Sequence, residues 1–313
     1  MKILFTGASS FTGYWFVKSL SEAGHDVVAT FTGNLDDYDG IRLKRVKKLM
    51  NHARIVWNCK FGTDSFFSLI KSEKNWDVFC LHGANVKNYK SEDFDIIQAL
   101  KENSLNAALV LDEFQKHELK KIIYTGSVFE ANEGLGEHPL RAFSPYGLSK
   151  GFTSDIFEYL CQTRSIDFAK FVIPNPFGPY EEERFTNYLV SSWLKGITPN
   201  VNTPEYIRDN IHISLLSILY LDFVEEKLSI FQKERAFRPS GYIESQGAFA
   251  QRFAKEIGPR LGIESDVILS PQTDFSEPLI RVNDQKVTKE LSEWSENYAW
   301  DELSEYYLRK FNN

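Results

Sequence analysis

The sequence predicts an α/β fold, a doubly wound parallel sheet with a smaller mixed lobe towards the C-terminus. Over residues 1–175, compact apolar runs alternate with segments of helical periodicity. The runs show little polar alternation, which is typical of parallel strands covered by helices on both faces. After the prolines of 174–179 this regular order is lost. We therefore predict one domain over 1–175 and a second lobe over 176–313, segments of which can return to the first domain.

Each expected strand is a short run rich in Ile, Leu, Val and Phe, bounded by turn residues or helical segments. The six strands are expected at 2–6, 27–31, 54–58, 77–82, 121–125 and 167–173. Parallel strands need long crossover connections, so a helix is expected in each interval. These helices are expected at 12–23, 41–51, 64–72, 91–117 and 145–163.

Local signals support the first and last of these helices. Trp15 and Phe16 begin a helical spacing in the first, and Gly24 follows as a cap. In the last, a stripe that docks the helix on the sheet is expected at Leu148, Phe152, Ile156 and Leu160. In the second lobe, helices are expected near 182–195, 213–225, 244–257 and 300–310.

Composition and charge exclude several classes of protein. The chain has 313 residues, of which 42% are hydrophobic and 25% charged, so disorder along the whole chain is not expected. Its formal net charge of −7 disfavours general attraction to nucleic acid or anionic membranes. One basic run, 42–48, is interpreted as the solvated face of a helix, with phosphate contact as the alternative.

The cysteines and histidines predict neither disulfides nor a metal site. The 3 cysteines lie far apart without a CxxC pair, which favours reduced thiols and a cytoplasmic location. The 6 histidines show no metal-ligand spacing. No apolar run approaches the roughly 20 residues of a membrane span, and Met1 leads directly into a strand. We therefore expect neither a membrane segment nor a signal peptide.

A glycine turn, Gly7-x-x-Ser10-x-x-Gly13, joins the first strand to the first helix. Gly7 permits the tight turn, and Gly13 lets the helix approach the strand. Backbone N–H groups at the start of that helix can bind a pyrophosphate. We expect a dinucleotide to contact Gly7, Ser9, Ser10, Phe11, Thr12 and Gly13. The alternative is a turn that binds no ligand.

The end of the second strand bears on which dinucleotide is bound. An acidic residue there usually binds the ribose 2′-hydroxyl of NAD. Here Thr30, Thr32 and Asn34 precede the first acid, Asp36. Thr32 can donate a hydrogen bond to a 2′-phosphate, and Arg42 can pair with it. The sequence therefore favours NADP, while NAD stays open.

Tyr146 and Lys150 lie four residues apart at the start of the helix that follows the fifth strand, so they share one helix face. A phenol titrates near pH 10, and a nearby ammonium favours its phenolate form. Such a tyrosine can exchange a proton with a substrate alcohol or ketone while a nicotinamide carries the hydride. Gly147 and Gly151 are expected to leave room for a ligand beside this pair.

The glycine turn, the Ser/Thr-bearing end of the fifth strand and the YxxxK pair resemble the extended short-chain dehydrogenase/reductase family. The closer resemblance is to its nucleotide-sugar epimerase/dehydratase/reductase branch. Further matching stretches begin at His82, Asn175 and Arg208, and resemble the branch's HxA, NxxGP and RDxxH segments. Asn103 resembles its helix asparagine. The resemblance implies a dinucleotide-binding Rossmann domain over 1–175 and a substrate-binding lobe after it.

The resemblance also implies roles for individual residues. Tyr146 would be the acid/base, and Lys150 would tune it and hold the nicotinamide ribose. His82, Gly83, Ala84 and Asn103 would lie beside the cofactor. Asn175 and Arg208 would contact the substrate's diphosphate.

A serine or threonine at the end of the fifth strand would bind the reacting sugar oxygen. Alignment from the strand assigns this role to Ser127, which we favour, whereas alignment from the residues after it assigns it to Thr125. The extra acid and base of 4,6-dehydratases are absent after Thr125. Glu130 lies near a glutamate position of UDP-glucuronate decarboxylases but does not align with it, so we predict no role for it.

The expected function is NAD(P)-dependent hydride transfer at a sugar carbon, expected to be C4, of a nucleotide-linked hexose. Either a 4-keto reductase or a 4-epimerase would use this chemistry, and the strand end favours the reductase. The alternatives are a small-molecule ketone reductase on the same fold and a non-catalytic NAD(P)-binding regulator. The family resemblance also implies a homodimer.

Overall fold

The structure is a computed structural model that describes residues 1–73, 75–228, 235–286 and 294–311. The chain forms two compact units. Unit 1 consists of Met1–Glu133, Arg141–Ile173 and Ser217–Phe237. Unit 2 consists of Gly134–Leu140, Pro174–Leu216 and Arg238–Asn313. Each unit is therefore assembled from three separate stretches of the chain.

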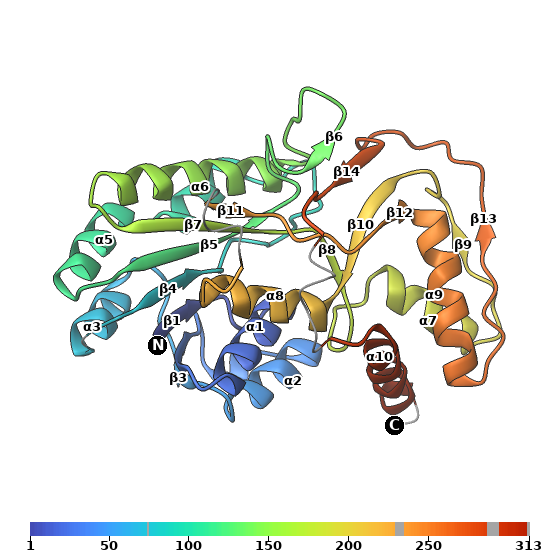
Figure 1. Cartoon of the computed structure of the whole chain (residues 1–313), viewed down its shortest axis with the longest axis horizontal. Coiled ribbons are helices and arrows are strands. Elements are labelled where there is room, and N and C mark those ends of the chain that lie inside the picture. The colour runs from blue at the N-terminus through green and yellow to red at the C-terminus, as the bar shows by residue number, and fades with distance from the viewer. Residues whose placement is uncertain (74, 229–234, 287–293, 312–313) are drawn as a thin grey trace. The chain divides into compact units, whose positions relative to one another are not determined.

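Unit 1 is built on a seven-stranded parallel sheet (Figure 1). Its order is β11-β7-β5-β4-β1-β2-β3, which places the first strand near the middle and winds the chain outwards in both directions. The strands are β1 (Lys2–Thr6), β2 (Asp26–Thr30), β3 (Arg54–Val56), β4 (Val78–Leu81), β5 (Lys121–Ser127), β7 (Asp167–Ile173) and β11 (Ala236–Phe237). This confirms the predicted doubly wound fold and each of its six expected strands.

Helices cover both faces of this sheet. One face carries α3 (Asp64–Ser72), α5 (Ala107–Lys116) and α6 (Pro145–Gln162). Their buried phenylalanines form one apolar cluster with the strands, which includes Phe66, Phe79, Phe114 and Phe157. Figure 1 shows α5 and α6 along this face and α1 (Phe11–Glu22) and α2 (Gly40–Leu49) beneath the sheet. The chain has 25 phenylalanines, and several of them therefore fill the layer between these helices and the strands.

The opposite face carries α1 (Phe11–Glu22) and α8 (Ile213–Val224). Phe16 of α1 stacks on Tyr220 of α8 with ring centroids 3.9 Å apart. Phe171 of β7 meets Tyr220 edge-on at 5.0 Å. A segment that follows residue 175 thus completes the covering of the sheet in unit 1.

Two expectations about helices are wrong. The helix expected over 91–117 is two helices, α4 (Ile96–Asn103) and α5. The helical path is interrupted at Asn106, which adopts a left-handed φ of 53°. The Asn106 side-chain amide donates a hydrogen bond to the Gly62 carbonyl at 2.8 Å. Asparagine tolerates this conformation better than most residues, and a left-handed residue cannot continue a right-handed helix.

The apolar stripe expected to dock α6 is also wrong. Phe152 is 46% exposed, and the residues that the helix buries include Lys150, Phe157 and Cys161. The four-residue spacing identified an apolar face correctly, but small residues on another face allow the closer approach to the sheet. Of the four expected residues, Leu160 packs against the apolar cluster of unit 1, Leu148 and Ile156 are partly buried, and Phe152 is exposed.

Unit 2 is smaller and mixed, as predicted. Its five-stranded sheet has the order β12-β10-β14-β6, with β8 also paired to β10. These strands are β6 (Leu135–Gly136), β8 (Asn175–Phe177), β10 (Ile207–His212), β12 (Tyr242–Ser245) and β14 (Ile280–Val282). A separate pair is formed by β9 (Asn200–Val201) and β13 (Ile268–Leu269).

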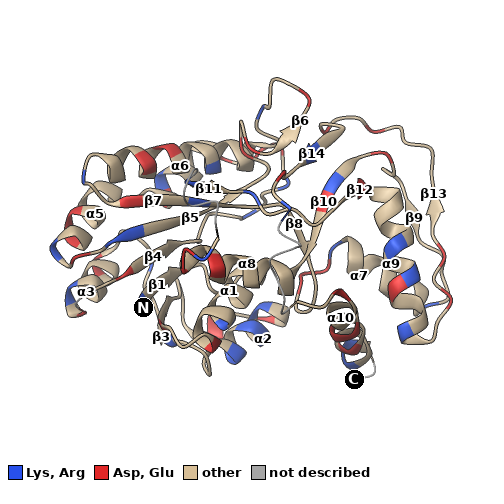
Figure 2. Cartoon of the chain, viewed as in Figure 1, with Lys and Arg blue, Asp and Glu red and all other residues tan. Residues whose placement is uncertain are grey.

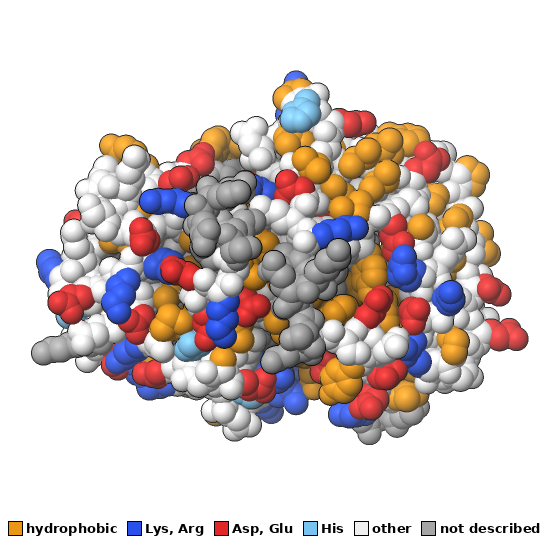
Figure 3. All heavy atoms as spheres, viewed as in Figure 1, with side chains coloured by type: hydrophobic (Ala, Val, Ile, Leu, Met, Phe, Trp, Pro, Cys, Tyr) orange, Lys and Arg blue, Asp and Glu red, His pale blue; other side chains and the backbone are white. Residues whose placement is uncertain are grey.

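The helices of unit 2 enclose an aromatic core. They are α7 (Phe185–Trp193), α9 (Gln246–Leu261) and α10 (Glu296–Phe311). Phe177 meets Phe249 at 5.1 Å and Trp300 at 5.5 Å between ring centroids. Among the described residues, no helix has the length and apolar character needed to cross a membrane. Figure 3 shows acidic and basic side chains interspersed over the visible face.

Candidate active site

The glycine turn has the close packing that its sequence predicts. Gly7 has φ of +76°, and a Cβ added there would lie 2.7 Å from the backbone of Gly83. A Cβ added at Gly13 would overlap the Gly7 carbonyl oxygen. The turn, α1 and the end of β4 can therefore approach each other only because these positions lack side chains.

Ser10, which replaces the usual middle glycine, caps α1. Its Oγ accepts a hydrogen bond from the Gly13 N–H at 3.1 Å and lies 3.0 Å from His82 Nε2. Thr12 Oγ1 is 3.2 Å from the same nitrogen, and Thr125 Oγ1 is 3.0 Å from His82 Nδ1. His82 therefore bridges the glycine turn to the end of β5.

Burial lowers the pKa of His82 to about 3, and the charge of Lys150 acts in the same direction. The ring is thus neutral at physiological pH, with one donor and one acceptor nitrogen. In the unfolded chain the group titrates near pH 6.5. Below that pH the unfolded state binds a proton at His82 and the native state does not. The contribution of His82 to the free energy of unfolding is therefore complete above pH 6.5 and is lost as the pH falls.

We expect the free energy of unfolding to fall more steeply with acid in wild type than in His82→Gln. Between about pH 6 and pH 4 the slopes should differ by about 1.4 kcal/mol per pH unit, the value for one proton. Urea unfolding at several pH values measures both slopes. Equal slopes would contradict the neutral, buried assignment.

Lys150 lies at the centre of unit 1, where α6 meets β5. It is 3% exposed, and its Nζ donates to the Thr125 carbonyl at 2.6 Å. The ammonium also lies over the Tyr124 ring, 4.3 Å from its centroid, while the Tyr124 hydroxyl donates to the Lys150 carbonyl at 2.8 Å. Burial lowers the pKa of Lys150 to about 8, and the carboxylate of Glu130 opposes that fall. The lysine is therefore held in one place and titrates not far above neutral pH.

Tyr146 lies in the first turn of α6. Ser144 caps this helix by accepting the Gly147 N–H at 3.2 Å, and Pro145 occupies its first position. The Tyr146 ring meets those of Tyr89 and Phe94 edge-on, with centroids 5.5 and 6.0 Å away. The capped helix start thus fixes the backbone that carries Tyr146, one turn before Lys150.

The two candidates at the end of β5 have different surroundings. Thr125 is 3% exposed, and its hydroxyl contacts His82 in the interior. Ser127, two residues further along the strand, is only partly buried, and its Oγ accepts the Phe129 N–H at 3.2 Å. Because Ser127 Oγ accepts in that bond, its own hydroxyl proton remains available for another acceptor. The Thr125 hydroxyl, by contrast, is engaged with His82.

Gly147 does not leave room for a ligand, because a Cβ there would overlap the Phe129 carbonyl oxygen. Gly151 is less closely packed, since a Cβ there would lie 3.9 Å from the Glu130 Cβ, an ordinary contact. The Phe129 backbone therefore fills the space beside Gly147. Sequence reasoning assigned no role to Glu130, which the structure buries completely.

The residues expected beside the cofactor differ in how close they lie to the glycine turn. Gly83 packs directly on Gly7, and Asn103 Oδ1 accepts the Asn85 N–H at 2.8 Å. Asn103 Nδ2 is buried without a hydrogen-bond partner among the described residues. Phe11 is buried at the start of α1, and Thr32 is exposed beyond β2. A glycine cradle with a spare buried donor fits a dinucleotide.

The basic run on α2 (Gly40–Leu49) is only partly a solvated face. Arg45 is 1% exposed, and its Nε donates to the Ser9 carbonyl at 3.0 Å. Arg42 donates to Ser9 Oγ at 2.8 and 3.0 Å and lies over the Tyr38 ring. Figure 2 marks the basic residues of α2 in blue along the ribbon. Two arginines are therefore directed to the glycine turn.

Asn175 and Arg208 belong to unit 2. Asn175 begins β8, and its Nδ2 is buried without a partner in the described part of the chain. Arg208 on β10 has its guanidinium engaged. It donates to three carbonyls, those of Ile207, Pro278 and Leu279, and pairs with Glu277 at 2.8 Å. These contacts hold β10 against the segment before β14, which sequence reasoning did not foresee.

Comparisons with known proteins agree with this arrangement. The family model described as "NAD dependent epimerase/dehydratase family" matches residues 3–214. No curated protein matches the chain. UDP-N-acetylglucosamine 4-epimerase from Methanobrevibacter ruminantium M1 has a similar structure, with a TM-score of 0.72 and 17% identity over 99% of each chain.

Two further solved structures share this fold along their whole length. UDP-glucose 4-epimerase from Thermotoga maritima has a TM-score of 0.70 and 18% identity, covering 100% of both chains. UDP-glucuronic acid 4-epimerase from Bacillus cereus has a TM-score of 0.73 and 16% identity, covering 99% of this chain and 100% of that one. The sheet order, the glycine turn and the family match over 3–214 lead to one conclusion: the chain belongs to the NAD dependent epimerase/dehydratase family and is an enzyme of the short-chain dehydrogenase/reductase type.

Proposed function

We propose that the protein is a nucleotide-sugar 4-epimerase that acts on a UDP-linked hexose. The observation that carries this proposal is the placement of Lys150 beneath the end of β5, with Tyr146 one helical turn away and Ser127 at the strand end. Family membership supports it, as do the similar 4-epimerases, whose printed names specify UDP-sugars.

In this proposal each side chain has one task. Tyr146 takes the proton of the sugar hydroxyl and later returns it, and Ser127 donates a hydrogen bond to the same sugar oxygen. Lys150 holds the cofactor ribose and stabilises negative charge on Tyr146. The bound nicotinamide supplies the hydride acceptor and donor. Gly7, Gly13 and Asn103 would hold the dinucleotide, with Ser9, Ser10, Thr12, Gly83 and Ala84 around it.

Asn175 is the diphosphate contact that we propose for the substrate, because a buried amide without a partner gains a bond when a phosphate oxygen arrives. For Arg208 the same role stays a prediction. Its guanidinium would have to exchange some of its carbonyl contacts for phosphate oxygens.

The decisive experiment is a direct assay of interconversion. UDP-glucose, UDP-N-acetylglucosamine and UDP-glucuronic acid would each be incubated with the enzyme and NAD, and the 4-epimers separated by chromatography. We expect one of them to reach equilibrium with its epimer without net consumption of NAD. If all three stay unchanged while free ketones are reduced, the small-molecule reductase replaces this proposal.

A second candidate, a 4-keto reductase that consumes NADPH, is favoured by Arg42. Its guanidinium lies against Ser9 of the glycine turn, where a positive charge would attract a ribose 2′-phosphate. Solved relatives from Bacillus cereus and Thermus thermophilus contain NAD. Cofactor choice therefore separates the two candidates.

For this second candidate we expect Arg42→Ala to weaken NADP binding by about 10- to 150-fold, the worth of a charged hydrogen bond, and to leave NAD affinity nearly unchanged. Thr32→Asp should shift preference further towards NAD, because an acid repels a 2′-phosphate. Calorimetric titration with both cofactors measures the effect. Lys44→Ala, which removes an exposed charge from the same helix, is the control. A wild-type protein that already binds NAD more tightly than NADP would contradict the assignment as an NADPH-dependent reductase.

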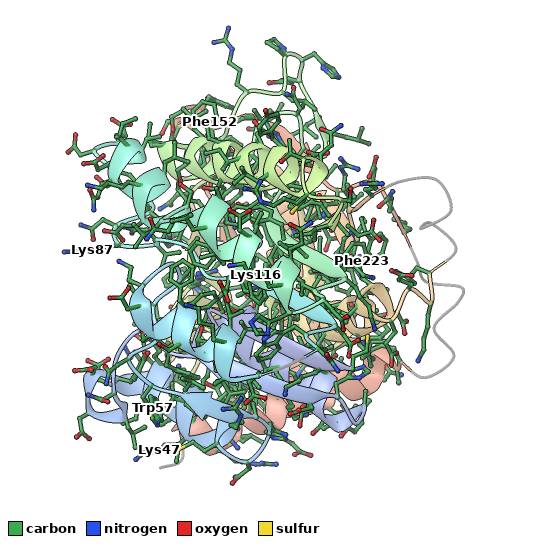
Figure 4. The ribbon with its side chains drawn as sticks, turned by 90° about the vertical axis from the view of Figure 1, so that its left-hand side faces the viewer. Lys47, Trp57, Lys87, Lys116, Phe152 and Phe223 are labelled. Carbon is green, nitrogen blue, oxygen red and sulfur yellow. The ribbon has the colours of Figure 1, made fainter. Side chains whose placement is uncertain are left out.

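We propose a homodimer as the assembly, formed through the exposed apolar side of α6. Phe152 and Tyr159 are 46% and 65% exposed and, seven residues apart, lie on one side of the helix. We expect the wild type to sediment as a dimer and Phe152→Glu as a monomer, because a buried charge opposes association. Lys47→Glu is the control, since Figure 4 shows Lys47 and Phe152 at opposite ends of unit 1. A monomeric wild type would contradict this assembly.

A further inference from the structure

Glu130 is a fully buried acid of unit 1, at 0% exposure, and it lies directly behind the proposed active site. Its Oε1 accepts the Ser127 N–H at 2.8 Å, and its own N–H donates to the Ser127 carbonyl at 3.0 Å. The two residues are therefore joined twice, across a tight turn. Any movement of Glu130 moves the backbone that carries the Ser127 hydroxyl.

A lysine from the neighbouring strand anchors this carboxylate. Lys170 Nζ lies 2.7 Å from Glu130 Oε2 and 2.6 Å from Glu133 Oε1. A Cβ added at Gly126 would come within 2.6 Å of the Lys170 Cε and 3.2 Å of Glu130 Oε1. Gly126 therefore leaves the space that the ion pair between Lys170 and Glu130 occupies.

The same turn is fixed against the helix that carries Tyr146 and Lys150. The Phe129 carbonyl occupies the space that a side chain at Gly147 would need, and Glu130 Cβ lies under Gly151. Gly126 on the strand therefore borders the carboxylate, and Gly147 and Gly151 on the helix border the turn that carries it. Burying an ion pair in this way is costly, so a neutral alternative would be expected if only stability were at stake.

We propose that Glu130 is a positioning residue for this active site: it fixes Ser127 through the turn and supplies the negative charge that keeps the buried Lys150 protonated. This inference rests on the proposed roles of Ser127, Tyr146 and Lys150. Glu130 itself touches neither substrate nor cofactor in this assignment.

The charges around Lys150 are consistent with this role. The carboxylate of Glu130 raises the pKa of Lys150, while burial and the ammonium of Lys170 lower it. Tyr124 of β5 and His82 after β4 also face the ammonium, and both are neutral because burial disfavours their charged forms. Tyr146 lies on the same helix. Burial raises the pKa of the Glu130 carboxyl itself, and the ammoniums of Lys170 and Lys150 oppose that rise. In its ionised form Glu130 is the anion that raises the pKa of Lys150.

The test compares two glutamates that share Lys170. Glu130→Gln removes the charge but keeps an oxygen for the Ser127 N–H. Glu133→Gln removes the same charge from the same lysine and leaves the Ser127 contact intact. NMR of lysine labelled with carbon-13 at Cε follows each titration in the full-length protein, and the signal missing in Lys150→Met assigns Lys150.

We expect Glu130→Gln to lower the titration midpoint of Lys150 by about one pH unit. It should lower kcat near pH 8 by about 5-fold, with KM little changed, because the charged fraction of the lysine falls from about one half to about one tenth. Glu133→Gln should stay close to wild type in both readouts. Glu130→Ala, which also loses the bond to Ser127, should lower kcat further at every pH.

Two results would overturn the inference. The first is an unchanged Lys150 midpoint in Glu130→Gln, which would mean that the carboxyl is neutral or too remote. The second is equal effects in Glu130→Gln and Glu133→Gln, which would indicate general electrostatics. If Glu130→Gln does not fold, Glu130→Gln combined with Lys170→Met removes both charges. Its Lys150 midpoint should still fall, by less than one pH unit, and a midpoint equal to wild type would overturn the inference.

These outcomes are separable from the proposed function. Loss of the Lys150 shift with intact epimerisation would count against Glu130 alone. A wild-type protein that converts no nucleotide sugar, but in which Glu130→Gln shifts the Lys150 titration, would count against the proposed reaction alone.

Discussion

Tyr146→Phe is expected to lower turnover by roughly 10²–10⁴, the usual contribution of a positioned acid/base, while leaving the fold intact. The substitution removes only the hydroxyl. The edge-on contacts of the ring with Tyr89 and Phe94 depend on its shape and remain. Steady-state rates with the substrate identified by the interconversion assay measure the loss.

A matched control comes from the same helix. Tyr159 is 65% exposed, so Tyr159→Phe makes the same chemical change away from Lys150. Its turnover should equal that of wild type. Dinucleotide affinity should be retained in both variants, because neither hydroxyl lies in the glycine turn. Tyr146→Phe with wild-type turnover would exclude Tyr146 as the acid/base.

Ser127→Ala is expected to lower kcat by about 10²-fold, the loss typical of removing one hydrogen-bond donor from a reacting oxygen. Its stability should change little, because the native contact of the hydroxyl is a single bond of 3.2 Å from Phe129 N. The measurement combines turnover with urea unfolding of the same samples.

Thr125→Val serves as the opposite case. It removes the hydroxyl that lies 3.0 Å from His82 Nδ1 and leaves a buried nitrogen without that partner, which costs about 1–3 kcal/mol. Its kcat should stay within a few-fold of wild type. If Thr125→Val loses turnover and Ser127→Ala does not, the roles of the two residues are exchanged.

The fold of unit 1 could be predicted from local pattern. Uninterrupted apolar runs indicate strands buried on both faces, and helical spacing between them indicates crossovers, so the parallel sheet follows from periodicity alone. The glycine turn was also predictable, because Gly7 requires a left-handed φ and Gly13 a close approach. Asn106 was missed because one left-handed residue leaves almost no mark on an apolar pattern that continues through it.

The placement of Tyr146 and Lys150 on one helix face was predictable from their spacing, but their surroundings were not. A four-residue interval places Tyr146 and Lys150 on one helix face whatever the rest of the chain does. Burial of Lys150, by contrast, depends on β5 and on small residues along α6 that no period identifies. The prediction that the stripe at Phe152 docks α6 on the sheet was wrong for the same reason. A regular apolar spacing does not reveal which part of the protein packs against that face.

The sequence by itself therefore determined the family fold, the position of the glycine turn and the residues expected to exchange a proton. Only the tertiary structure decided which hydroxyl of β5 is accessible, that Arg42 and Arg45 are directed to the glycine turn, and that Glu130 lies behind Ser127. The physical reason is range. Periodicity and turn chemistry act over a few residues, whereas burial and charge act between groups such as Glu130 and Lys170, which meet only after the sheet has formed.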